Sequence, residues 1–150
     1  DFEQQHADIF SAPASAPEWP AFRCGELLKQ FKGEWVYNTD WKMINGHPKK
    51  AGWIKAIQEA QQTVQKGLKL DCPILVMSSN KSFPETETWH EEYMTSDIVL
   101  DVQDIQKYGE KLGDKVTRDT IPNGIHDLIL SQKPYRNDAY QTIFEWLKKQ

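Results

Sequence analysis

The sequence predicts an α/β fold, in which helices flank a parallel β-sheet. Residues 72–77 and residues 116–121 have the composition of strands, and a stretch with helical spacing follows each of them. This alternation is typical of parallel sheets, because a helical connection returns the chain to the end of the sheet from which the next strand starts. With 150 residues, of which 39% are hydrophobic, the chain is long enough for one packed core.

The N-terminal third carries weaker signals. Residues 11–20 are rich in Pro, Ala and Ser and predict a loop, residues 26–31 suggest a short helix, and residues 33–48 read as an aromatic loop. We therefore expect two parts, a cap or linker segment over residues 1–50 and an α/β segment over residues 51–150.

The clearest helix is expected over residues 52–68. Its apolar residues recur every three or four positions, which places them on one face of a helix. The face consists of Trp53, Ile57, Ala60, Val64 and Leu68. We expect it to pack on the sheet.

The strands and the helix between them follow in order. Residues 72–77 form an unbroken apolar run, which is typical of a parallel strand buried on both faces. A helix is expected over residues 102–112 and ends at Gly113, a natural C-cap position. Residues 116–121 predict the next strand, and residues 122–124, Pro-Asn-Gly, predict its exit turn.

The last helix is expected over residues 138–149, with Asn137 as its N-cap. Its apolar face would consist of Tyr140, Ile143, Phe144 and Leu147. We expect this helix, together with the one over residues 52–68, to cover the two adjacent strands.

Charge and composition exclude several classes of function. The formal net charge of −4 provides no basic surface for nucleic acid. Neither a signal peptide nor a membrane span is visible, and Cys24 and Cys72 are far apart, so we expect a cytoplasmic protein with two reduced thiols. The His-Glu-Glu run at residues 90–92 has Met94 where a second zinc-binding histidine would stand, so no metal site is predicted.

The most informative run covers residues 121–128. It reads as the end of a strand, a turn that contains Gly124, and then His126. A histidine that a loop presents after a parallel strand is a candidate general base. None of the seven serines lies in a G-x-S-x-G sequence, the setting in which such a base activates a serine. The seven serines are Ser11, Ser15, Ser78, Ser79, Ser82, Ser96 and Ser131.

Several stretches, in order, resemble the bacterial α/β-hydrolases of the lysophospholipase and serine aminopeptidase type, a monoacylglycerol lipase-like group. The resemblance covers residues 25–150. The stretches are KGEW with a following DW (32–41), GW-I-K-AI (52–57), CPILVM (72–77), SDIVLDVQDI (96–105), HDLILS (126–131) and EWL (145–147).

The resemblance implies that this chain is the C-terminal half of a serine hydrolase, comprising part of a helical cap and the last two strands of the sheet. The nucleophilic serine would then lie before residue 1. The implied substrate is a small-molecule ester or peptide-like compound, and the reaction needs no cofactor. The apolar sheet edge is expected to pair with the missing N-terminal half or with a second copy of the chain.

The same resemblance implies roles for single residues. His126 would be the general base, and Asp97, which precedes it by 29 positions, would be the acid that orients and stabilises it. Asp101 is the close competitor for the acid. Asn80 occupies a position where the family often carries aspartate, but an amide supplies no charge.

Two alternatives stay open. Trp35 and Trp41 either line a substrate pocket or pack in the core, whereas the core is the expected place for Trp53 on its helix face. The rival function is that of a non-catalytic binding protein that kept the hydrolase scaffold. It is favoured by Ser78, where the family usually has histidine, and by Asn80.

Overall fold

The computed structural model of the protein describes residues 34–36, 38, 40–41, 50–86 and 88–150. The chain divides into two units, residues 1–62 and residues 63–150, and each is considered by itself. The helix predicted over residues 26–31 lies outside the described residues, as does most of the predicted aromatic loop. The predicted division between residues 50 and 51 stays a prediction.

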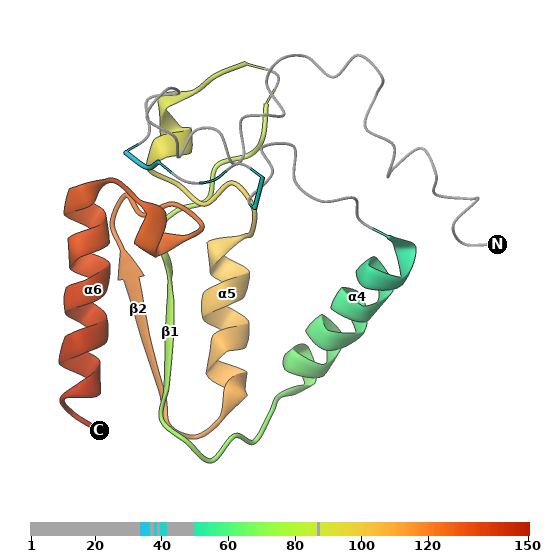
Figure 1. Ribbon diagram of the computed structural model, residues 1–150. Coiled ribbons are helices and arrows are strands. Elements are labelled where there is room, and N and C mark those ends of the chain that lie inside the picture. The colour runs from blue at the N-terminus through green and yellow to red at the C-terminus, as the bar shows by residue number, and fades with distance from the viewer. Residues whose placement is uncertain (1–33, 37, 39, 42–49, 87) are drawn as a thin grey trace. The chain divides into compact units, whose positions relative to one another are not determined.

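Two strands form a parallel sheet in the described part of the chain (Figure 1). Strand β1 (Ile74–Ser79) pairs with β2 (Val116–Ile121), so the prediction of adjacent parallel strands is confirmed. The bounds of β2 are those predicted. Strand β1 begins two residues later than predicted, after Pro73, and continues through the buried Ser78 and Ser79. The described elements therefore form a mixed α/β fold.

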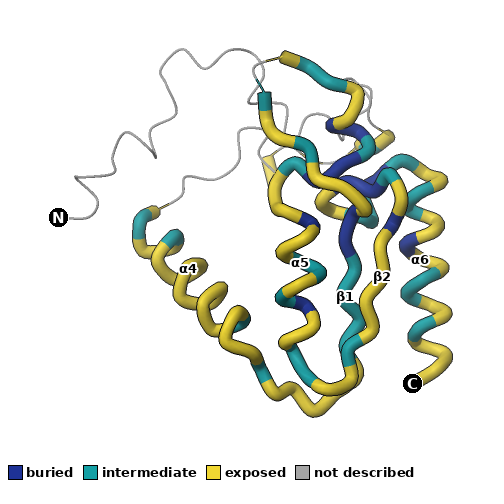
Figure 2. The backbone as a smooth tube through the Cα atoms, turned by 180° about the vertical axis from the view of Figure 1, so that it is seen from behind, coloured by how far each residue is buried: buried dark blue, intermediate teal, exposed yellow. Residues whose placement is uncertain are grey.

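The two strands lie between two helices, as both views show (Figures 1 and 2). Helix α5 (Val102–Gly109) packs on β1, and a short 3₁₀ turn, Glu110–Leu112, completes the predicted helix before Gly113. The contact between α5 and β1 is close, because a Cβ atom at Gly109 would lie 2.8 Å from a methyl carbon of Val76. Leu75 and Met77 point to the other face, since side chains alternate along a strand.

Helix α6 (Lys133–Leu147) packs against β2 and begins five residues earlier than predicted. Gln132, and not Asn137, occupies the N-cap position, so the predicted cap is wrong. The helix can begin this early because Pro134 lies in its first turn. A proline is tolerated there because the first backbone N–H groups of a helix have no helical acceptor.

The predicted packing face of α6 is wrong in part. The buried position is Ala139, with 0% of its surface exposed, and Ile143 is half-buried beside it. A small residue lets the helix approach the strand closely, and the Trp146 indole N–H donates to the Thr117 hydroxyl of β2 at 3.2 Å. The larger side chains of the predicted face are exposed. They are Tyr140, Phe144 and Leu147.

Helix α4 (Ala51–Lys66) confirms the prediction of a helix in this region. None of its residues is buried, and Trp53 is 53% exposed. The helix crosses the boundary between the two units, so the predicted packing of its apolar face, and a core position for Trp53, stay predictions. No helix in the described part of the chain has the length and apolar character that crossing a membrane requires.

Most of the buried residues of the second unit lie at the carboxyl ends of the two strands and in the loops that follow them (Figure 2). Ile121 closes β2 with 2% exposure, and Tyr93 and Asp97, in the loop after β1, are 1% exposed. Ligand sites of parallel sheets are found at this end of the strands. The most tightly packed part of the unit is therefore also the place where a site is expected.

Candidate active site

Asp97 is held against the chain segment that follows β1. Its backbone N–H donates to the Lys81 carbonyl at 3.0 Å, and its own carbonyl accepts from the Phe83 amide at 2.9 Å. These two bonds form an isolated parallel bridge between Ser82 and Asp97. The intervening loop returns to the sheet at Asp97, which places a carboxylate at the carboxyl end of β1.

Aromatic packing within this loop was not predicted from the sequence. Tyr93 packs edge-on against Phe83 at 5.5 Å and against Trp89 at 5.8 Å between ring centroids, and His90 lies beside both Phe83 and Tyr93. The Tyr93 hydroxyl accepts from the Thr86 amide at 2.8 Å. The cluster gives the loop a small core of its own, which supports the return of the chain to Asp97.

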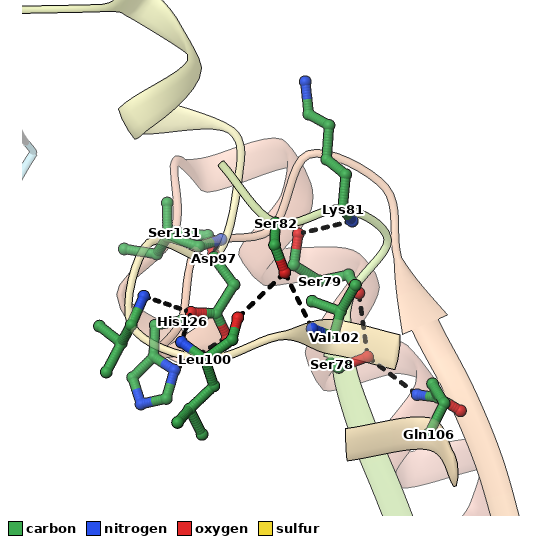
Figure 3. Close-up of polar contacts among 12 residues, drawn as sticks. Ser78, Ser79, Lys81, Ser82, Asp97, Leu100, Val102, Gln106, His126 and Ser131 are labelled. Carbon is green, nitrogen blue, oxygen red and sulfur yellow. Dashed lines mark hydrogen bonds and ion pairs between the residues drawn. The ribbon is translucent and has the colours of Figure 1, made fainter. Parts of the chain in front are cut away.

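The Asp97 carboxylate accepts three hydrogen bonds (Figure 3). One oxygen, Oδ1, accepts from the Val99 amide at 2.8 Å and from the Leu100 amide at 2.9 Å. The other, Oδ2, lies 2.9 Å from His126 Nδ1. The two amides leave the carboxylate a single orientation, in which Oδ2 faces the imidazole.

The turn after β2 delivers His126 to this carboxylate. The Gly124 amide donates to the Ile121 carbonyl at 3.1 Å, and Asn123 has a φ of 58°, a left-handed conformation that asparagine tolerates better than most residues. A Cβ atom at Gly124 would lie 2.6 Å from a methyl carbon of Leu128 and 3.2 Å from the Ile121 carbonyl oxygen, so a larger residue here would force the Leu128 side chain to move.

Asn80 has a structural role that the sequence did not reveal. Its side-chain oxygen accepts from the Asn123 backbone amide at 3.0 Å, which ties the end of β1 to the turn that precedes His126. A side-chain oxygen is needed for this bond, and a negative charge is not. The amide at position 80 is thus explained without reference to a triad acid.

The charges of the pair are coupled. Burial raises the pKa of the Asp97 carboxyl, but hydrogen bonds from His126 and from two backbone amides outweigh it and hold that pKa below its ordinary value of 3.8. The hydrogen bond to Asp97 raises the pKa of His126 above 6.5; partial burial opposes this shift, and the negative charges of Asp97 and Asp127 add to it.

The contact also determines the tautomer of His126. A carboxylate only accepts hydrogen bonds, so Nδ1 carries the proton and Nε2 has a free lone pair when the ring is neutral. Nε2 makes no hydrogen bond to the described residues, and the side chain is 41% exposed. The imidazole is therefore oriented as a general base that is open to a partner.

A cavity of about 500 Å³ adjoins His126. Its apolar wall is formed by Leu75 and Met77 of β1 and by Ala139 and Ile143 of α6. The loop that carries the histidine forms the remaining wall, over residues 126–129. His126 thus stands at the rim of an apolar space that includes side chains of β1.

Asp101, the alternative acid, has a different role. Its Oδ1 accepts from the Gln103 amide at 2.8 Å and caps the N-terminus of α5. The carboxylate that contacts His126 is that of Asp97, so the structure does not support the alternative.

The structure describes five of the seven serines, and none of the five hydrogen-bonds His126. Four of their hydroxyls bond to backbone groups, whereas the hydroxyl of Ser96 is buried without a hydrogen-bond partner. The five are Ser78, Ser79, Ser82, Ser96 and Ser131. Within the described part of the chain no serine therefore contacts His126.

Trp35 and Trp41 belong to the first unit, whereas Asp97 and His126 belong to the second. Trp41 is 85% exposed, and Trp35 is half-buried. Their predicted contact with substrate stays a prediction.

The site thus consists of a buried carboxylate, an imidazole that it orients, and an adjoining apolar cavity. The expected pairing of Asp97 with His126 is confirmed by their 2.9 Å contact, while their catalytic roles stay predictions. Comparisons of the chain with protein-family models, with curated proteins and with solved structures find no match.

Proposed function

We propose that this chain supplies the acid and the base of a Ser-Asp-His triad in a serine hydrolase of the lysophospholipase and serine aminopeptidase type, acting on an ester or peptide-like bond. The observation that carries the proposal is the 2.9 Å contact between Asp97 Oδ2 and His126 Nδ1. The carboxylate is 1% exposed, and the histidine follows a parallel strand. This order of acid and base along the chain is that of α/β-hydrolases.

In the proposed mechanism, His126 Nε2 removes the proton of a serine hydroxyl while the serine oxygen bonds to the substrate carbonyl carbon. The carbonyl oxygen becomes an oxyanion, and Asp97 stabilises the imidazolium that forms. The imidazolium then gives its proton to the leaving oxygen or nitrogen as the bond to the carbonyl carbon breaks. Water repeats these steps on the acyl-enzyme and releases the acid.

The proposed nucleophile lies outside this chain. No serine has the G-x-S-x-G setting, and the hydroxyls of the described serines point to backbone groups or into the packed interior. We therefore propose that the chain is the C-terminal half of the hydrolase fold, that residues 1–50 belong to its cap, and that Trp35 and Trp41 contact the substrate there.

The proposed partner surface is the unpaired edge of β1. Residues 74–77 are apolar on both faces, which is typical of a strand inside a parallel sheet whose two faces are covered, and the described sheet has β2 alone beside it. The outer strand β2 is polar and exposed over residues 117–120, as edge strands usually are. An N-terminal half of the fold, or a second copy of the chain, would pair with β1.

Light scattering tests this pairing. We expect the chain to self-associate as its concentration rises, or to form a complex with a polypeptide that contains the G-x-S-x-G segment. If the chain stays monomeric at high concentration and does not bind the added polypeptide, the edge of β1 needs no neighbour.

The chain alone is expected to be catalytically silent. We expect no covalent labelling by a fluorophosphonate probe and no turnover of a short-chain ester above the rate in buffer, because the described serines are bonded elsewhere or buried. An intact serine hydrolase serves as the positive control. Turnover that persists after His126→Ala would place the activity away from this pair.

The rival function, a binding protein on the same scaffold, loses part of its support in the structure. Asn80 is explained by its bond to the Asn123 amide, which a catalytic protein would need equally. A binding protein also has no need of a buried carboxylate that determines the tautomer of an exposed histidine. Tight binding of an ester by the complete protein without release of acid would favour the rival.

A further inference from the structure

Ser131 holds the loop that carries the candidate base. Its side chain is 1% exposed, and its hydroxyl oxygen accepts from the Ile125 amide at 3.0 Å. Ile125 is the residue immediately before His126 and is itself buried. Figure 3 shows Ser131 close to the Asp97 and His126 pair.

The same residue connects the loop to helix α6. The Ser131 amide donates to the Leu128 carbonyl at 3.3 Å, and the Ser131 carbonyl accepts from the Arg136 guanidinium at 3.3 Å. The hydroxyl bond then runs back across the loop to Ile125. The Ser131 side chain therefore closes residues 125–131 into a loop, and His126 is one of the residues of that loop.

The bond from the Ile125 amide to Ser131 matters because it supports the hydrogen bond between His126 and Asp97, which is short-range. A hydrogen bond weakens steeply once its atoms leave the separation of about 2.7–3.2 Å, so a small shift of the loop would uncouple His126 from Asp97. Without the Ser131 hydroxyl, the buried Ile125 amide would have no acceptor, and the loop would move to reach water or another carbonyl.

We propose that Ser131 is a positioning residue for His126, and that its hydroxyl holds the Ile125 amide so that Nδ1 faces Asp97 while Nε2 stays open to a partner. Its consequence for catalysis rests on the proposed function. The positioning itself is a property of the loop and is measured without a substrate.

Ser96 provides a matched control. It is 0% exposed, precedes Asp97 in the sequence, and its hydroxyl has no hydrogen-bond partner among the described residues. Ser96→Ala therefore removes a hydroxyl that is as buried as that of Ser131, from the residue next to Asp97 in the sequence, but without breaking a hydrogen bond. Ser131→Cys keeps the approximate volume of the side chain while replacing the oxygen with a poor acceptor.

The test compares Ser131→Ala, Ser131→Cys and Ser96→Ala in the full chain by NMR. We expect amide hydrogen exchange at Ile125 to accelerate about fivefold in both Ser131 variants, the equivalent of one neutral hydrogen bond, relative to the Thr117 amide of β2. The pKa of His126 falls toward its ordinary value in the same variants. Ser96→Ala leaves both quantities unchanged.

Two results would overturn the inference. One is unchanged exchange at Ile125 together with an unchanged His126 pKa in Ser131→Cys, which also decides the matter if Ser131→Ala does not fold. The other is an equal response in Ser96→Ala, which would show that any buried hydroxyl near the site acts alike. Intact Ser131 effects in a complete protein that shows no His126-dependent labelling of a serine would instead contradict the proposed function, so the two failures are distinguishable.

Discussion

In the proposed hydrolase, turnover is expected to fall by about 10⁴-fold when Asp97 is replaced with asparagine, the size of loss seen when a triad acid becomes an amide. The asparagine oxygen still accepts from the Val99 and Leu100 amides, so the loop keeps its shape. Its NH₂ group, however, donates to His126 Nδ1, which moves the ring proton to Nε2 and blocks the base. The effect is measured as kcat on a short-chain ester, with KM nearly unchanged.

Asp101→Asn is the matched control for this variant. Asp101 lies four positions further on and caps α5 through its Oδ1, and asparagine is an equally good N-cap. We expect kcat to stay within about twofold of the wild type, because asparagine keeps the cap of α5 and the carboxylate that contacts His126 is that of Asp97. A large loss in Asp101→Asn with full activity in Asp97→Asn would transfer the acid role to Asp101.

The free energy of unfolding is expected to depend on pH through the same pair. The pKa of Asp97 is lowered on folding, so its contribution is complete above 3.8 and is lost as the pH falls through the folded pKa. The pKa of His126 is raised, so its contribution is complete below 6.5 and is lost as the pH rises through the folded pKa. Both contributions are therefore complete between pH 3.8 and 6.5.

Asp97→Ala is expected to lower the free energy of unfolding by roughly 1–3 kcal/mol within this window, because two backbone amides and the imidazole lose their acceptor. The decline on the high-pH side should also disappear, since His126 no longer gains a partner on folding. Urea unfolding at several pH values on both sides of the window provides the measurement.

Asp101→Ala is the control for the stability measurement on Asp97→Ala. Loss of the α5 N-cap is expected to lower the free energy of unfolding by about 1 kcal/mol and to leave the high-pH decline in place. If Asp97→Ala gave a profile parallel to that of the wild type, the coupling of Asp97 and His126 in the folded state would be contradicted.

The elements that the sequence predicts best are those with a strong pattern. The side chains of strand β2 alternate in character, and Pro-Asn-Gly follows its last residue, so the sequence indicates where the strand lies and where it ends. The run of apolar residues in β1 marks a buried parallel strand, although its start moves past Pro73. The pairing of Asp97 with His126 was predicted from a family resemblance and from the order of acid and base, and periodicity alone would not have revealed it.

The features that the sequence did not reveal depend on single contacts. Pro134 reads as a helix breaker, yet it lies in the first turn of α6, where its missing N–H has no effect. On α6, the small Ala139 is buried and the larger Phe144 is exposed, because close approach to the strand outweighs the area of the side chain. Asn80 and Ser131 each bond to one backbone amide, and such bonds leave no repeating signal in the sequence.

The measurement that tests the central claim most directly is the identification of the serine that His126 is proposed to activate. The coding sequence upstream of Asp1 is expressed together with this chain, the protein is labelled with a fluorophosphonate, and the labelled peptide is identified by mass spectrometry. We expect a single label on the serine of a G-x-S-x-G sequence outside residues 1–150, lost in His126→Ala and strongly slowed in Asp97→Asn. A label on a serine within residues 1–150, or labelling at the wild-type rate in His126→Ala, would contradict the account.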